Sequence, residues 1–79
     1  MRSTVKLPRV AETVDEVVVS EILVEVGSAV AAGDILMRVE TDKALVEVPS
    51  PIGGVVFEWV VAEDEEIATG APVVVIDTD

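Results

Sequence analysis

At the middle of the chain stands the stretch Glu40-Thr41-Asp42-Lys43-Ala44-Leu45-Val46-Glu47-Val48-Pro49-Ser50-Pro51. An apolar run, residues 35–39, precedes its polar start, and a second run, residues 46–48, follows Lys43. Branched residues on both sides of a short polar segment predict two strands joined by a tight turn. Asp42 suits such a turn because its side chain can bond nearby backbone groups. The pattern therefore predicts a hairpin that holds the Lys43 amine in water at its tip.

The rest of the composition favours a sheet protein. The 79 residues are 51% hydrophobic, valine is the commonest of them, and there is one Trp, one Phe and no Tyr. Many small branched side chains suit a sheet core, and the length predicts one domain, residues 1–79. Further β-prone runs lie at 5–8, 17–26, 55–61 and 73–76. The alternation within 17–26 is imperfect, which indicates a bulge or burial on both faces. No stretch predicts a helix.

Charge and residue usage exclude several classes of function. Sixteen acidic and five basic residues give a formal charge of −11, which argues against binding nucleic acid or an anionic membrane surface. There is no Cys and no His, so soft metal sites and the usual nucleophile–base pairs are not expected. The N-terminal residues lack the apolar stretch of a signal peptide. We therefore expect a non-catalytic protein without a metal that is not secreted and enters no membrane.

The sequence also contains an internal repeat. A shift of 37 positions places Val18 on Val55 and Gly33 on Gly70, without a gap. Other apolar positions that coincide are Val19/Val56, Leu23/Val60, Val30/Ile67, Leu36/Val73 and Val39/Ile76. Each half is too small to close its own core, so the halves should pack against each other about a pseudo-two-fold axis. We expect an all-β flattened barrel or sandwich of short antiparallel strands, with its core at the positions that are apolar in both copies.

The repeat has a consequence for Lys43. The same shift places Asp42 on Asp79, the last residue of the sequence. The lysine turn and the C-terminus are then symmetry-related, and we expect them at opposite ends of the domain. Such an arrangement suits a carrier, because a reactive group at one end can be tethered from the other.

The sequence Glu40-Thr41-Asp42-Lys43-Ala44, with Val46-Glu47-Val48-Pro49-Ser50-Pro51 and Gly54 after it, resembles the lipoyl-attachment motif of lipoyl domains. These domains are the carrier modules of the acyltransferase components of 2-oxoacid dehydrogenase complexes. The resemblance covers nearly the whole chain, from Leu7-Pro8 to the last β-prone run. It implies two four-stranded antiparallel sheets with quasi-two-fold symmetry, in agreement with the repeat.

The resemblance also implies a function and a set of partners. Lys43 would carry lipoate through an amide, and Asp42 and Glu40 would help a lipoate–protein ligase or lipoyl/octanoyl transferase to recognise the target. The arm would shuttle acyl groups and reducing equivalents between a thiamine-diphosphate-dependent 2-oxoacid decarboxylase, an acyltransferase core and dihydrolipoamide dehydrogenase. Its implied location is the bacterial cytoplasm or the mitochondrial matrix.

One loop departs from the family pattern. Residues 9–16 match the loop that lies near the lysine and helps the decarboxylase to recognise its own domain. Family members commonly carry a glycine before the acidic residue of this loop, whereas here Ala11 precedes Glu12. The departure bears on the choice of decarboxylase and leaves the attachment motif intact.

Two alternatives stay open on the residues. A biotin carrier would share the fold, but biotin domains usually carry Met on both sides of the target lysine, and here Asp42 and Ala44 flank Lys43. An unmodified β module used for protein contacts is the second. It predicts that replacing Lys43 by arginine changes nothing.

Overall fold

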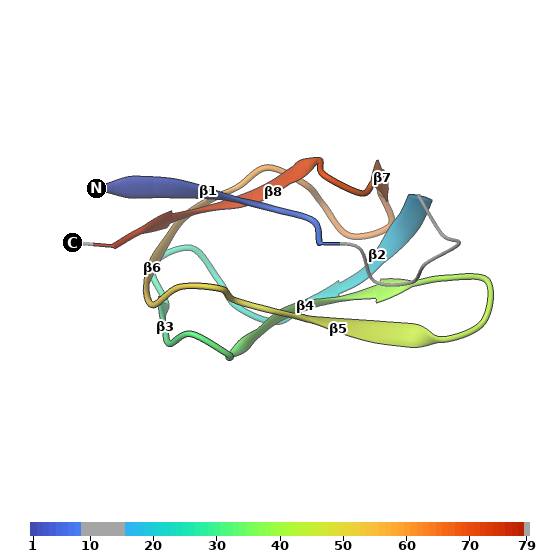
Figure 1. Ribbon diagram of the computed structural model, residues 1–79, viewed down its shortest axis with the longest axis horizontal. Coiled ribbons are helices and arrows are strands. Elements are labelled where there is room, and N and C mark those ends of the chain that lie inside the picture. The colour runs from blue at the N-terminus through green and yellow to red at the C-terminus, as the bar shows by residue number, and fades with distance from the viewer. Residues whose placement is uncertain (9–15, 79) are drawn as a thin grey trace.

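A computed structural model describes residues 1–8 and 16–78, and within these residues it contains strands and connections but no helix (Figure 1). The strands are β1 (Arg2–Lys6), β2 (Glu16–Ile22), β3 (Ala29–Val30), β4 (Ile35–Glu40), β5 (Leu45–Pro49), β6 (Gly54–Trp59), β7 (Glu66–Ala68) and β8 (Pro72–Asp77). No helix that could span a bilayer occurs in the part of the chain described.

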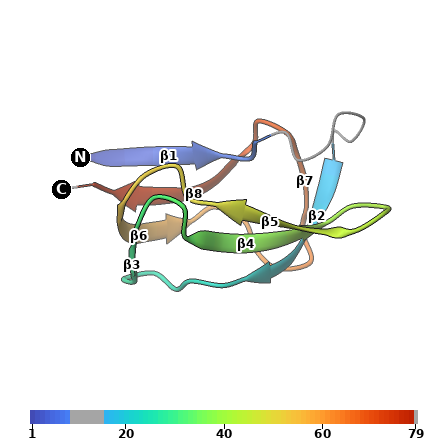
Figure 2. The ribbon, with the colours of Figure 1, turned by 60° about the horizontal axis from the view of Figure 1, so that its bottom comes forward.

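The strands form two four-stranded sheets, in the orders β1-β8-β6-β3 and β5-β4-β2-β7. Every pairing is antiparallel, and the two sheets lie one on the other (Figures 1 and 2). Ladders join neighbours within each sheet, and none among the described strands joins one sheet to the other. The expectation of two four-stranded sheets is confirmed. Of the two forms expected for them, the sandwich is correct and the barrel is wrong.

The pseudo-two-fold relation between the halves is confirmed by the strand pairing. Under the shift of 37 positions, β4 falls on β8 residue for residue. The sheet orders correspond when β5, β4, β2 and β7 are replaced by β1, β8, β6 and β3. The β2–β4 ladder shifts register over residues 19–21, and the β6–β8 ladder shifts at the equivalent place, residues 56–58. The bulge expected in the long β-prone run is therefore present, and it occurs in both halves.

The core lies between the sheets. Its fully buried side chains are Val19, Leu36, Met37, Val39, Val48, Val73, Val74 and Ile76. Not every position that is apolar in both copies belongs to it: Leu23 and Val60 are 38% and 46% exposed, and Val55 is 43% exposed. That part of the expectation is wrong. Successive strand side chains point to opposite faces of the sheet, so Val55 must face outward if Val56 faces the core.

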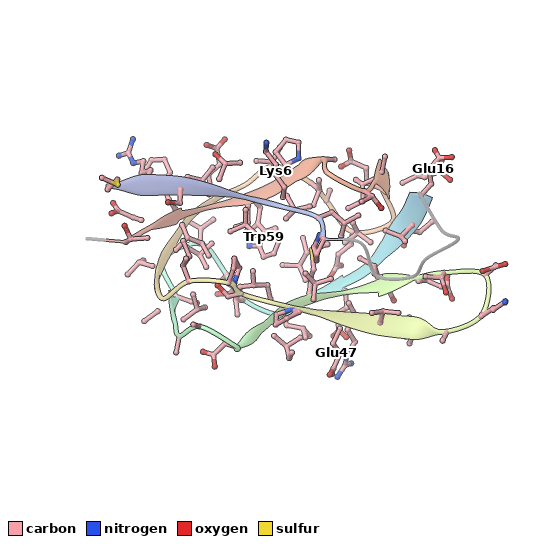
Figure 3. The ribbon with its side chains drawn as sticks, viewed as in Figure 1. Lys6, Glu16, Glu47 and Trp59 are labelled. Carbon is pink, nitrogen blue, oxygen red and sulfur yellow. The ribbon has the colours of Figure 1, made fainter. Side chains whose placement is uncertain are left out.

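The chain crosses between the sheets after β2. This strand ends at Ile22, before the end of the β-prone run, because the following residues pass to the other sheet. There the Gly27 amide donates to the Val56 carbonyl oxygen at 2.8 Å. The indole N–H of Trp59, a side chain labelled in Figure 3, donates to the Val24 carbonyl oxygen at 3.0 Å and anchors the crossing segment. The β-prone run at 17–26 thus contains both a strand, up to Ile22, and the segment that crosses to the other sheet.

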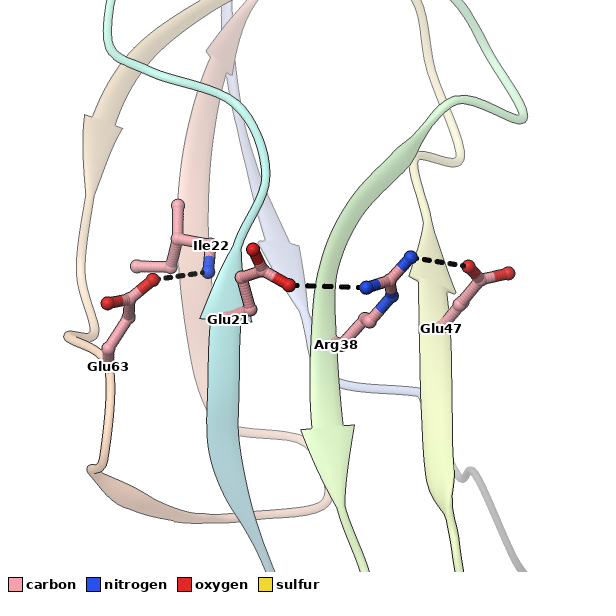
Figure 4. Close-up of polar contacts among 5 residues, drawn as sticks. All are labelled: Glu21, Ile22, Arg38, Glu47 and Glu63. Atoms are coloured by element: carbon pink, nitrogen blue, oxygen red, sulfur yellow. Dashed lines mark hydrogen bonds and ion pairs between the residues drawn. The ribbon is translucent and has the colours of Figure 1, made fainter.

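The outer face of the β5-β4-β2-β7 sheet carries a row of charges. Arg38 lies between two carboxylates, with Nη1 3.2 Å from Glu21 Oε1 and Nη2 3.5 Å from Glu47 Oε2 (Figure 4). Each of the three side chains comes from a different strand. All three are exposed, at 42%, 51% and 55%, so water and salt screen the ion pairs.

We predict that Arg38→Met lowers the free energy of unfolding by less than about 1 kcal/mol, because exposed ion pairs contribute little. Methionine keeps an unbranched stem across the sheet and removes only the charge. Urea denaturation at low and high salt measures the difference, which should shrink at high salt. A loss above about 2 kcal/mol that persists at high salt would mean that the row is a major support of the fold.

Candidate functional site

Lys43 lies in the connection between β4 and β5. The last ladder pair of this hairpin is Glu40 with Leu45, and residues 41–44 form the turn beyond it. Figures 1 and 2 show the hairpin at the end of the molecule opposite the start of β1 and the end of β8. The domain is elongated, with principal extents of 36 × 20 × 17 Å. The structure therefore confirms an exposed lysine at a hairpin tip, at the end of the domain opposite the start of β1 and the end of β8.

Thr41 organises the turn. Its backbone amide donates to the Ala44 carbonyl oxygen at 2.9 Å, and its hydroxyl donates to the same oxygen at 3.0 Å. The hydroxyl oxygen also accepts hydrogen bonds from the Lys43 amide at 3.2 Å and the Ala44 amide at 3.1 Å. In an ordinary β-turn the fourth amide donates to the first carbonyl. Here the Thr41 side chain takes the place of that carbonyl, as Ser and Thr do in turns.

The expectation that Asp42 braces the turn is wrong. Among residues 1–8 and 16–78, its side chain makes no hydrogen bond or ion pair, and it is exposed. The threonine before it does this work. The signal was present in the sequence, since a threonine just before a tight turn can bond the amides that follow it.

The Lys43 side chain is exposed, and its ammonium group pairs with no carboxylate in the described residues. Glu40 and Asp42 are the two residues that the sequence analysis assigned to recognition of the site. They lie at the same end of the hairpin as Lys43 and are also exposed. No group of His, Cys, Asp and Glu in the described part of the chain could hold a metal ion. Within the described residues the site therefore offers a primary amine without an ion-pair partner, and this amine is a nucleophile once it loses a proton.

The opposite end of the domain repeats part of this geometry. The Thr78 amide and hydroxyl both donate to the Met1 carbonyl oxygen, at 2.7 and 3.0 Å. These two bonds are the counterparts of the two that Thr41 donates to Ala44. The bonds of Thr78 can therefore be compared directly with those of Thr41 at the other end of the same domain.

The sequence also assigned a recognition role to the loop at residues 9–16. Residues 9–15 lie outside the described part of the chain. Glu16, the last residue of that assignment, begins β2 and pairs with Ala68.

Comparison with protein families gives a match over almost the whole chain. The biotin/lipoyl family, described as "Biotin-requiring enzyme", matches residues 3–76. The match includes the hairpin and all eight strands apart from the first residue of β1 and the last of β8.

Two similar proteins are components of 2-oxoacid dehydrogenase complexes. The chain is 36% identical over 77 residues to the dihydrolipoyllysine-residue acetyltransferase component of the pyruvate dehydrogenase complex of Haemophilus influenzae, which covers 98% of the chain. It is 37% identical over 71 residues to the succinyltransferase component of the 2-oxoglutarate dehydrogenase complex of Bartonella vinsonii, which covers 90% of the chain. The chain spans 13% and 17% of the length of these relatives.

A solved structure of similar size gives the same fold. The lipoyl domain of the 2-oxoglutarate dehydrogenase complex from Azotobacter vinelandii superimposes with a TM-score of 0.73 and 26% sequence identity. The match covers 94% of each chain. The likeness therefore extends over both sheets and is not confined to the hairpin.

Proposed function

Since the chain belongs to the biotin/lipoyl attachment family, we propose that it is a lipoyl carrier and that Lys43 is the attachment residue. The observation that carries the proposal is the exposed Lys43 amine at the tip of a hairpin, which forms no ion pair within the described residues. An exposed amine at a hairpin tip is accessible to a modifying enzyme. Acylation would remove its charge and leave a flexible arm at the end of a rigid sandwich.

The residues around Lys43 fit an amide-linked group. No carboxylate in the described residues forms an ion pair with the Lys43 ammonium group. Among these residues, therefore, no ion pair has to be broken before the amine loses its proton. The nitrogen then attacks an activated carboxyl group, a C–N bond forms and the activating group leaves. When attached, the lipoyl group supplies a dithiolane that accepts and passes on electrons and acyl groups. The protein holds the arm in place and leaves it free to move.

Lipoate is favoured over biotin by the relatives and by the residues beside the lysine. Both relatives named above are dihydrolipoyllysine-residue acyltransferase components. Asp42 and Ala44 flank Lys43, where biotin domains usually carry methionine. We propose that Asp42 and Glu40, both exposed beside the lysine, are read by the lipoylating enzyme, a lipoate–protein ligase or a lipoyl/octanoyl transferase.

We place the carrier in a 2-oxoacid dehydrogenase complex, where it would meet the decarboxylase, the acyltransferase core and dihydrolipoamide dehydrogenase in turn. Tethering raises the effective concentration of the carried group at each of these active sites. The net charge of −11 favours encounters with basic surfaces on such partners. In this scheme the domain presents the group, and its partners supply the catalysis.

Parallel modification reactions test the attached group. The purified chain is incubated with ATP, lipoate and lipoate–protein ligase, and in a second reaction with ATP, biotin and biotin–protein ligase. Intact mass should rise by one lipoyl group in the first reaction and stay constant in the second. A biotin increment alone would assign the chain to the biotin carriers. No increment in either reaction would favour the unmodified interaction module.

A further inference from the structure

In the lysine turn, residues 41–44, Thr41 is the residue whose side chain has every hydrogen-bonding position in use. A threonine hydroxyl has one donor and two acceptor positions. Thr41 Oγ1 donates to the Ala44 carbonyl oxygen and accepts from the amides of Lys43 and Ala44, at 3.0, 3.2 and 3.1 Å. We propose that Thr41 is the positioning residue of the attachment site: its hydroxyl fixes the backbone of Lys43 for the modifying enzyme. The inference rests on the function proposed for Lys43.

The need for such a residue follows from where the ladder stops. The last pair of the hairpin is Glu40 with Leu45, so the strands do not restrain the backbone of Asp42 and Lys43. The side chains of both residues are exposed and make no bond within the described part of the chain. The Thr41 hydroxyl is therefore the group that ties the Lys43 amide to the scaffold.

Fixing the backbone and freeing the side chain serve different purposes. The amine must be mobile to travel once it is modified. The modifying enzyme, however, has to align one amine with an activated carboxyl group, and misplacement by about 1 Å can cost about 100-fold in rate. A turn with one backbone conformation lowers the entropy that the enzyme must remove on binding. Thr41 supplies that conformation through the Lys43 backbone amide and makes no hydrogen bond to the side-chain nitrogen, Nζ.

Thr41→Val and Thr41→Ser separate the hydroxyl from the shape of the side chain. Valine keeps the branched shape and removes all three hydrogen bonds, whereas serine keeps the hydroxyl. The other end of the domain provides a matched control, because Thr78 donates the same pair of bonds to the Met1 carbonyl oxygen and lies far from Lys43. Thr78→Val therefore removes one strand-end bond, the one donated by the Thr78 hydroxyl, away from the attachment site.

The first measurement needs no attached group. In the unmodified domain, hydrogen exchange followed by NMR reports each amide separately. We expect the Lys43 and Ala44 amides to exchange about tenfold faster in Thr41→Val, since each loses its acceptor. In Thr41→Ser and Thr78→Val the two amides should exchange as in the wild type. Core amides, such as those of Val39 and Val48, identify any variant whose fold is affected, and Thr41→Ala is then the second variant without a hydroxyl.

The second measurement is kcat/KM for modification by lipoate–protein ligase. We expect a loss of about tenfold in Thr41→Val, a value within about twofold of the wild type in Thr41→Ser, and no change in Thr78→Val. Equal rates for the wild type and Thr41→Val would overturn the inference, as would an equal loss in Thr78→Val. Modification of the wild type is the separate test of the proposed function, so the two failures are distinguishable.

Discussion

Lys43→Arg is expected to abolish modification by lipoate–protein ligase. The arginine would keep the positive charge and the exposed place at the hairpin tip. A guanidinium stays protonated at any pH that the fold tolerates, however, so it has no free nitrogen lone pair with which to attack a carboxyl group. Intact mass after overnight incubation should show one lipoyl increment on the wild type and none on Lys43→Arg.

The chain contains its own control for this experiment. Lys6 is the only other lysine of the sequence; it is exposed and lies in β1, where its backbone pairs with Pro72. Lys6→Arg should be modified at the wild-type rate. If modification requires only an exposed amine, Lys43→Arg will instead gain an increment at Lys6, and the role given to the lysine turn is wrong.

Gly54→Ala is expected to lower the free energy of unfolding by about 3 kcal/mol. Gly54 begins β6 and pairs with Val30 of β3. A Cβ at this position would overlap the backbone carbonyl oxygen of Asp77 and would lie 2.8 Å from the Ile76 side chain. Because the first of these atoms is backbone, the clash can be relieved only by moving β8 away from β6. Urea denaturation measures the change.

The neighbouring glycine is the matched control. An alanine Cβ at Gly53 would have the Val30 carbonyl oxygen as its nearest neighbour, at 3.5 Å, which is an ordinary contact. Gly53→Ala should therefore change the free energy of unfolding by less than about 1 kcal/mol. Equal effects of the two substitutions would show that loss of chain flexibility, and not the approach of β8, decides the outcome.

Much of the fold follows from local patterns in the sequence. The β-branched runs on both sides of Thr41 and Asp42 predict the hairpin, because residues that favour strands flank a short segment of residues that favour a turn. The repeat of 37 positions predicts the relation between the sheets, because two halves with the same pattern bury their apolar faces against each other. Both features depend on neighbours in sequence, and both are present in the structure.

The features that the sequence did not predict depend on contacts between distant residues. β3 and β7 have two and three residues, too few to show an alternating pattern, and they form because β6 and β2 offer free edges. The run after Val17 does not stay in one strand, since Gly27 bonds Val56 in the other sheet. Leu23 and Val60 are apolar yet exposed, and their hydrophobicity alone could not separate them from the core.

The place of the candidate lysine was predicted from the sequence, and the construction of its turn only in part. The position of Lys43 followed from the pattern around it. The brace was assigned to Asp42, whereas the structure gives that role to Thr41. Both residue types can bond turn amides, and the choice between them depends on which side chain points back into the turn. The direction of the Thr41 side chain depends on the place where the β4–β5 ladder stops, because Thr41 directly follows the last pair, Glu40 with Leu45.

Mapping the modified residue tests the central claim most directly. The wild-type chain is treated with lipoate–protein ligase and digested, and the peptides are sequenced by tandem mass spectrometry. The account predicts a single lipoyl increment on Lys43, with Lys6 unmodified. An increment on Lys6, or a chain that stays unmodified while a known lipoyl domain in the same tube is lipoylated, would contradict it.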